Sequence, residues 1–112
     1  MTLFIGLISG TSADGIDAAL LRVEPGESRT ATDADPTPRA HVLAARTTPY
    51  DPALRATILR VSQVDATLDL DAFGALDVVV GEAFAAAALA LVAEAGVAIA
   101  DVRAIGSHGQ TL

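Results

Sequence analysis

The stretch that most constrains this chain is a polar segment, Ser9 to Asp17, which lies between two apolar runs. These runs, Leu3 to Ile8 and Ile16 to Val23, are short, rich in Leu, Ile and Val, and bounded by turn residues, so they predict two strands. The segment between them is therefore expected to be a tight connection in a hairpin. Its glycines let backbone N–H groups approach a ligand closely, and its hydroxyls add further donors. Phosphate oxygens fit such a surface best.

The same segment has a simpler interpretation, in which Asp14 and Gly15 form a primed hairpin turn with no ligand. It is not a P-loop, because no Gly-Lys-Ser or Gly-Lys-Thr follows. It is not a dinucleotide-binding fingerprint either, because a strand rather than a helix comes next. A phosphate-binding strand–loop–strand element and an ordinary turn both remain open from these residues alone.

Composition excludes several classes of protein. At 112 residues the chain is one domain at most, and 52% hydrophobic residues allow a real core. The absence of cysteine excludes a disulfide framework and a thiolate metal site. A net charge of −7, with no lysine and no basic stripe, argues against nucleic acid as a partner. The longest apolar stretch, residues 73–100, is interrupted by Asp77, Glu82 and Glu94, so no membrane span is expected.

The middle of the chain predicts a loop and a third strand. Residues 24–39 are rich in Pro, Gly, Ser, Thr and Asp, which predicts a flexible loop within the domain. Residues 41–48 then form an apolar run that is expected to pair with the second strand in a long hairpin. His41 lies beside the loop, where a solvated side chain is a better interpretation than a ligand.

Two helices are expected next. Asp51 followed by Pro52 is a typical helix start, and this first helix is expected to end near Gln63. A second helix is expected from Asp69 or Asp71 to about residue 95, with Gly96 just after its end. Its alanine-rich half suits close packing on a sheet.

A last strand is expected within residues 97–105, followed by a polar loop over residues 107–111. A right-handed helical crossover would place this strand parallel to the first one, which should lie in the middle of the sheet and be buried on both faces. The carboxyl ends of the two strands would then meet at one edge of the sheet. The two polar loops that follow them would converge there and form half of a ligand site.

Two motifs resemble those of a known family. Residues 6–17 (GLISGTSADGID) are similar to the N-terminal motif of the anhydro-N-acetylmuramic acid kinases, and residues 105–111 (IGSHGQT) resemble their second motif. The resemblance implies the α/β fold of actin-like ATPases, which is related to the RNase H-like fold. Residues 1–112, in the order strand, strand, strand, helix, helix, strand, would be the N-terminal part of the first lobe.

The resemblance also implies an activity. The family opens the 1,6-anhydro bond of 1,6-anhydro-N-acetylmuramic acid with water and phosphorylates O6, using ATP and Mg2+, during cytoplasmic recycling of peptidoglycan. The full-length protein would be a homodimer that uses a sugar and ATP, without nucleic acid or membrane partners. Its catalytic base, an aspartate, would lie beyond Leu112. Phosphoryl transfer needs both lobes, so residues 1–112 alone are expected to be inactive.

Site residues follow from the resemblance, position by position. The residues implied to bind the ATP phosphates are Gly10, Thr11, Ser12, Ala13, Asp14, Gly15, Ile16 and Asp17. Asp14 or Asp17 is also a candidate for Mg2+, through a bound water, with Asp14 the one chosen, although Asp14 could equally cap its own turn. The residues implied to lie near the sugar are Ser107, His108 and Gln110. The first strand ends in Leu7-Ile8-Ser9, without the acid that many actin-like kinases carry there.

Two other classes compete with a kinase. An RNase H-like nuclease shares the strand order, but it needs acids on the first strand and a basic surface, and this sequence has neither. A non-catalytic ligand-binding or structural α/β module needs only the fold. Whether the natural gene continues past Leu112 is the observation that separates this module from the enzyme.

Overall fold

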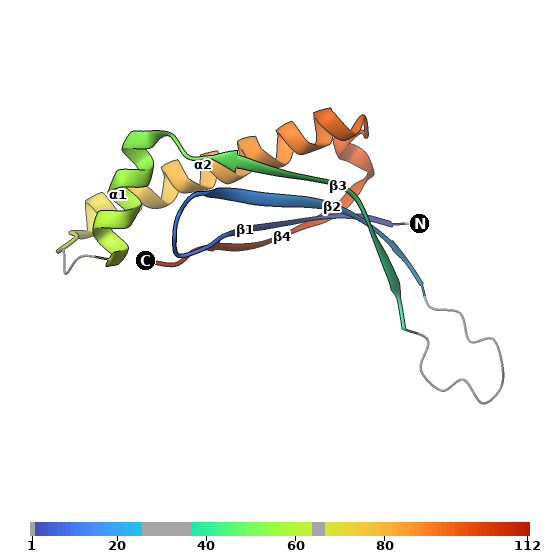
Figure 1. Ribbon diagram of the computed structural model, residues 1–112, viewed down its shortest axis with the longest axis horizontal. Coiled ribbons are helices and arrows are strands. Elements are labelled where there is room, and N and C mark those ends of the chain that lie inside the picture. Colours follow the sequence, from blue (N-terminus) through green and yellow to red (C-terminus); the bar gives the residue numbers. More distant parts are fainter. Residues whose placement is uncertain (1, 26–36, 64–66) are drawn as a thin grey trace.

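The structure, a computed structural model, describes residues 2–25, 37–63 and 67–112. Its elements follow in the order strand, strand, strand, helix, helix, strand (Figure 1). Their bounds are β1 Thr2–Ser9, β2 Gly15–Glu24, β3 Arg39–Pro49, α1 Pro52–Gln63, α2 Leu70–Ala95 and β4 Val102–Gln110, with a 3-10 turn, η1, at Ile99–Asp101. This confirms the α/β class and the predicted order of elements.

The four strands form one mixed sheet in the order β3-β2-β1-β4. β1 pairs antiparallel with β2 and parallel with β4, and β2 pairs antiparallel with β3. The crossover through the helices therefore returns the chain beside β1, as predicted. This arrangement is consistent with the first lobe of an actin-like ATPase.

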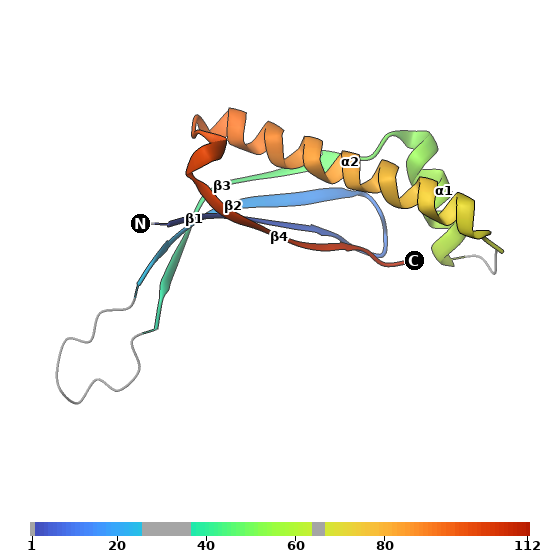
Figure 2. The ribbon, with the colours of Figure 1, turned by 180° about the vertical axis from the view of Figure 1, so that it is seen from behind.

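The loop predicted for residues 24–39 is shorter at both ends. Glu24 and Arg39 face each other in the β2–β3 ladder, so both belong to strands. Cross-strand pairing extends the hairpin away from the helices (Figures 1 and 2). Of the rest of the predicted loop, residues 26–36 lie outside the described residues.

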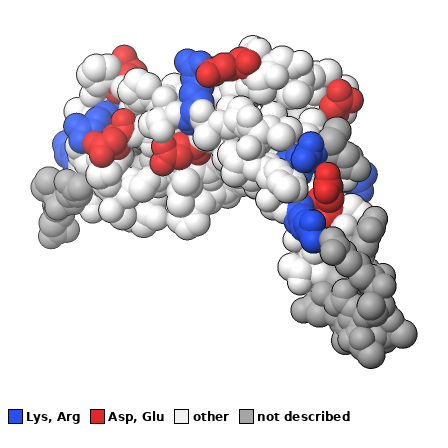
Figure 3. Space-filling view, turned by 45° about the vertical axis from the view of Figure 1, so that its right-hand side comes forward, with Lys and Arg blue, Asp and Glu red and all other residues white. Residues whose placement is uncertain are grey.

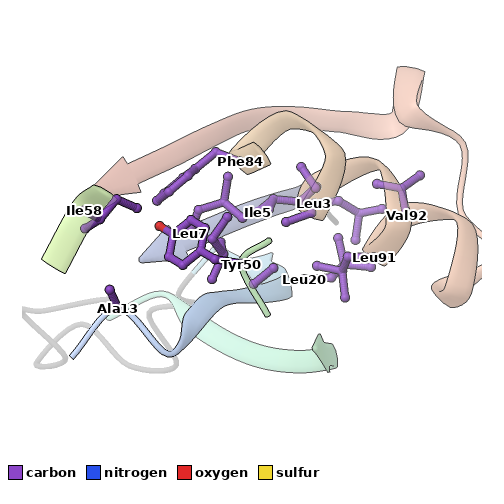
Figure 4. Close-up of a cluster of buried hydrophobic side chains, with 14 of the residues drawn as sticks. Leu3, Ile5, Leu7, Ala13, Leu20, Tyr50, Ile58, Phe84, Leu91 and Val92 are labelled. Atoms are coloured by element: carbon purple, nitrogen blue, oxygen red, sulfur yellow. The ribbon is translucent and has the colours of Figure 1, made fainter. Parts of the chain in front are cut away.

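The core lies on one face of the sheet, under α2. Side chains alternate along a strand, and alternate residues of β1 (Leu3, Ile5 and Leu7) are buried there. Phe84, Leu91 and Val92 of α2 pack over the same face (Figure 4).

The expectation that β1 is buried on both faces is wrong for the described residues. Ile8, on the opposite face, is 45% exposed. In the described ranges no helix lies against this second face, which stays open to solvent (Figures 1 and 2). An apolar sequence shows that both faces of a strand are compatible with burial. Whether a face is buried depends on the elements that pack against it.

Both helix starts are capped, at Asp51 as predicted and also at Asp69, where the sequence predicted only a helix start. Asp51 Oδ2 accepts hydrogen bonds from Ala53 N (3.2 Å) and Leu54 N (3.3 Å) at the start of α1. At the start of α2, Asp69 Oδ1 accepts from Ala72 N at 2.7 Å. Gly96 ends α2 with a φ of 71°, the left-handed conformation that glycine adopts most easily.

α2 is long and apolar enough to cross a membrane by length and composition, which the sequence interpretation had not expected. Its acids are spaced widely enough to leave an 18-residue window with a mean hydropathy of 2.0. One third of that window is buried, on the side that packs against the sheet. A helix that packs on a core has the same composition, so a single such helix is weak evidence for a membrane span.

The polar segment predicted as a loop after the last strand is part of β4, which continues to Gln110. The segment stays extended because it pairs with β1. Ser107 lies opposite Leu7, and Gln110 lies opposite Ser9. Two steps along β1 therefore match three along β4, which is a β-bulge, and Gly109 within it has a φ of 77°. The bulge sets Gln110 opposite Ser9.

Leu91 and Leu89 on α2 offer a test of the core. Leu91 is fully buried, whereas Leu89 is 57% exposed on the same helix. We expect Leu91→Ala to lower the free energy of unfolding by about 2–5 kcal/mol, because it removes buried methyl groups and leaves a cavity. Leu89→Ala should change it by less than about 0.5 kcal/mol. Urea denaturation followed by circular dichroism measures both, and equal effects would contradict the position of α2.

Candidate functional site

The connection between β1 and β2 is a compact turn at the end of the sheet. Ala13 N donates to Gly10 O at 3.0 Å, which closes the turn around Thr11 and Ser12. Ala13 has a φ of 50°, the one positive φ of a non-glycine residue in the described ranges. Gly15 has no positive φ, so the primed Asp14-Gly15 turn does not form. The hydroxyl residues Thr11 and Ser12 stand exposed at the tip.

Gly15 serves the packing of two strands. A Cβ at this position would lie 2.7 Å from the backbone oxygen of Thr48 on β3, closer than atoms can pack. At Gly10, by contrast, a Cβ would meet nothing within 4 Å. The sequence predicts close approach to a ligand for both glycines, with a primed turn as the alternative at Gly15. The structure shows that Gly15 is needed for the approach of β3.

The predicted phosphate-binding residues face different surroundings. Ala13 and Ile16 point into the core, with 0% and 1% of their surface exposed, so only their backbone is left for a ligand. Asp14 and Asp17 are exposed. Asp17 accepts a hydrogen bond of 2.6 Å from Thr47 Oγ1 on β3.

Arg55, on the first turns of α1, holds the turn from the side. Its Nε donates to Ala13 O at 3.1 Å, and its Nη2 donates to Ser12 O at 3.3 Å and to Asp14 Oδ1 at 3.2 Å. Sequence reasoning missed this residue, because an arginine on a helix some forty positions away belongs to no local motif. The cap at Asp51 indicates that Arg55 lies near the start of a helix, but it gives no sign that Arg55 contacts the turn.

Gln110 joins the two segments that the sequence expected to converge. Its Oε1 accepts from Ser9 Oγ and from the Tyr50 hydroxyl, the latter at 3.4 Å. Its Nε2 donates to Gly10 O at 3.2 Å and to Thr111 O at 3.1 Å. Convergence of the β1 and β4 ends is therefore confirmed. The amide of Gln110 is engaged within the protein in this structure.

Two hollows flank the end of β4. One, of about 500 Å3, lies between α2 and β4, and its polar lining includes Asp77, Ser107 and His108. The other, of about 610 Å3, lies on the open face of the sheet and is lined by Asp17, Ser107 and His108 among others. Asp17 and His108, from the two predicted site segments, thus border one hollow.

Charged side chains do not gather into a basic surface on the face shown in Figure 3, where Arg side chains lie beside acidic ones. The ion pairs of the described residues are Arg22–Glu24, Arg46–Glu94 and Arg55–Asp14. All six side chains are at least one-third exposed, so each pair contributes little to stability on its own.

The donor set for a metal is sparse. In the part of the chain that the structure describes, no three His, Asp or Glu side chains come together to hold a metal ion. Asp14 and Asp17 are paired with Arg55 and Thr47. Mg2+ commonly keeps several waters and binds through few carboxylates plus substrate phosphates. These residues fit contact with Mg2+ through a bound water and do not fit an all-protein site.

Tyr50, at the end of β3, is the buried titratable group of this region, and it is 6% exposed. Burial raises the pKa of its hydroxyl above the usual 10.0, because a buried phenolate loses its hydration, and a hydrogen bond with Ser9 partly opposes this rise. The hydroxyl therefore stays protonated and able to donate over the physiological range.

Comparison with known proteins settles the family. The family described as "Anhydro-N-acetylmuramic acid kinase" matches residues 2–112. The chain belongs to this family. Proteins called anhydro-N-acetylmuramic acid kinase from Xylella fastidiosa and Xanthomonas axonopodis pv. citri are 48% and 46% identical to it over 110 residues, or 98% of the chain. The corresponding protein of Microcystis aeruginosa is 42% identical over 110 residues.

The chain spans about a quarter of the length of these kinases, with 26%, 27% and 26% of the three relatives covered. Family membership, first indicated by the motifs at residues 6–17 and 105–111, is thereby confirmed. The first motif covers the end of β1, the turn after it and the start of β2, and the second lies at the end of β4, which is the neighbour of β1 in the sheet.

Gly15 and Gly10 provide a matched test of the turn. We expect Gly15→Ala to lower the free energy of unfolding by about 1–3 kcal/mol, because its Cβ must push Thr48 away. Gly10→Ala should change stability by less than about 0.5 kcal/mol. Thermal unfolding followed by circular dichroism checks both. Equal melting temperatures for the two variants would show that β2 and β3 are not packed this closely.

Tyr50 can be titrated without interference, because the chain has one Tyr and no Trp. We expect its tyrosinate absorbance to appear at a higher pH in the folded chain than in urea, where the pKa is about 10. The raised pKa means that folded Tyr50 holds its proton more tightly. Its contribution to stability is therefore present below about pH 10 and is lost as pH rises through the folded pKa. The Tyr50→Phe variant should not show this loss of stability at high pH. If the tyrosinate absorbance of the folded chain and of the chain in urea titrates at the same pH, the hydroxyl is not buried.

Proposed function

We propose that residues 1–112 form the start of the first lobe of an ATP-dependent kinase that opens 1,6-anhydro-N-acetylmuramic acid with water and phosphorylates its O6. The observation that carries this proposal is the family match over residues 2–112. Relatives that bear the name of this kinase align over 98% of the chain. The product, N-acetylmuramic acid 6-phosphate, would enter peptidoglycan recycling in the cytoplasm, and the full-length enzyme would act as a homodimer.

We propose that the turn after β1 binds the ATP phosphates. Thr11 and Ser12 stand exposed at its tip, where their hydroxyls and the backbone of Gly10 and Gly15 can donate to β- and γ-phosphate oxygens. Ala13 and Ile16, which the resemblance also assigns to this site, would contribute backbone only, because their side chains are buried. Such fixed donors stabilise charge that develops on the transferred group.

The end of β4 is the proposed sugar side of the site. Ser107 and His108 are exposed and line both hollows, so either side chain can reach a sugar hydroxyl there. Gln110 is half-buried and bonded to Ser9, Gly10 and Tyr50. Its proposed part is to tie the sugar side to the phosphate-binding turn.

Mg2+ and the base complete the proposal. Mg2+ would neutralise charge on the phosphates, and Asp14 or Asp17 would face it through a bound water, as their single exposed carboxylates allow. The aspartate that activates water is proposed to lie in a segment outside these residues. Since transfer depends on positioning by both lobes, residues 1–112 by themselves should not catalyse transfer.

The test is an assay of the complete product of the gene that encodes this sequence. We expect ATP, Mg2+ and 1,6-anhydro-N-acetylmuramic acid to yield a sugar that has gained one phosphoryl group and one water, measured by mass spectrometry. N-acetylmuramic acid, which has no 1,6-anhydro bridge to hydrolyse, is the matched substrate control and should gain no water. An unchanged anhydrosugar would reject the kinase and favour a non-catalytic binding module.

Two serine variants locate the phosphate site in the same assay. Ser12→Ala should lower kcat/KM for ATP by about ten- to a hundredfold, because it removes one donor from the turn. Ser62→Ala on α1 is the control, since its hydroxyl has no hydrogen-bond partner among the described residues. Equal rates for the two variants would remove Ser12 from the site.

A further inference from the structure

We propose that Arg55 is the positioning residue that holds the β1–β2 turn in the shape in which it receives the ATP phosphates. This inference rests on the proposed function and adds to it a residue on another element, α1. Neither of the two sequence motifs contains Arg55, and the resemblance assigns it no role. Three observations support the assignment: the contacts of Arg55, the packing of the helix segment that carries it, and its position near the N-terminus of that helix.

The contacts of Arg55 are with three consecutive residues of the turn. Ser12 O, Ala13 O and Asp14 Oδ1 accept from one guanidinium at 3.1 to 3.3 Å. A planar fork of donors can hold three acceptors in a fixed relative geometry, which a single ammonium group cannot. The contact with Ala13 is at the residue whose φ is 50°, so the guanidinium holds the turn at its one left-handed residue.

These contacts orient the backbone of the turn. In a planar trans peptide the carbonyl and the following N–H point in opposite directions. Because Ala13 O is directed at Arg55, the N–H of Asp14 is directed away from it. The guanidinium thus fixes the direction of a backbone donor in the segment proposed to bind phosphate, and its positive charge lies beside that segment.

Arg55 lies on a part of α1 that is capped and packed into the core. It lies one turn before Ile58, which is fully buried in the core, and its own N–H donates to Asp51 O at 2.9 Å in the capped first turn of α1. Tyr50, just before this cap, is buried as well. Figure 4 shows Ile58 and Tyr50 on the same side of the sheet as Ala13, so the turn and the helix share one core.

The place of Arg55 on α1 is not explained by helix stability. It is the fourth residue of a helix that starts at Pro52, and α1 has no acidic residue in its first turn. A cation near a helix N-terminus opposes the helix dipole. The contacts with the turn compensate for this cost, which is why we assign the residue to the turn and not to the helix.

The experiment compares Arg55→Ala, Arg55→Lys and Arg22→Ala in the complete gene product. Arg22 is a matched control, because it also pairs with an acid, at 3.4 Å, its side chain is 33% exposed, against 42% for Arg55, and it lines neither of the two hollows. Its partner, Glu24, lies at the end of β2 that is remote from the turn. Amide hydrogen exchange of a peptide covering residues 10–17 is measured by mass spectrometry, together with KM for ATP and for the anhydrosugar.

We expect Arg55→Ala to speed exchange in this peptide and to raise KM for ATP, each by about tenfold, the effect of losing charge-assisted hydrogen bonds. KM for the sugar should stay within about twofold, and Arg55→Lys should fall between wild type and Arg55→Ala because it keeps the charge without the fork. Arg22→Ala should match wild type in all three quantities.

Unchanged exchange at residues 10–17 in both Arg55 variants would overturn the proposal. Faster exchange with an unchanged KM for ATP would also overturn it, because the contact would then be structural only. A wild-type protein that does not phosphorylate the anhydrosugar would reject the proposed function. In that case the exchange data, which need no substrate, still decide whether Arg55 holds the turn.

Discussion

The parallel pairing of β1 with β4 is the constraint on which the rest of the structure depends. It joins residues about a hundred positions apart and can form only after two helices have returned the chain to the first strand. Once formed, it sets Ser9 opposite Gln110 and brings the turn after β1 next to the end of β4. The convergence of the two motifs follows from this register.

The bulge at Gly109 refines that pairing. In an even register Ser9 would face Gly109, which has no side chain to donate or accept. The extra residue in β4 moves Gln110 into that place, where its amide contacts Ser9, Gly10 and Tyr50. A glycine with a φ of 77° makes the bulge possible, since an L side chain is strained there. Backbone geometry thus decides which side chain reaches the turn.

The sequence predicted elements well wherever the signal is local. The apolar runs, the cap at Asp51, the approximate start of α2 and the C-terminal Gly96 were predictable, because these signals depend on residues a few positions apart. The two family motifs were visible for the same reason. The end of β4 was not predicted, because Ser107 to Gln110 is polar and rich in glycine, and only pairing with β1 keeps it extended.

Site geometry was less predictable, because its contacts are non-local. Asp14 and Gly15 suggested a primed turn, whereas the turn closes between Gly10 and Ala13 and Gly15 makes room for Thr48. Arg55 was one of seven scattered arginines until folding placed it against the turn.

The sequence by itself determined the α/β class, the order of elements and the family, since periodicity, caps and motifs lie in short stretches of chain. Only the tertiary structure decided which face of β1 is covered, which glycine is sterically required and which arginine contacts the turn. These depend on distances between segments that meet after folding.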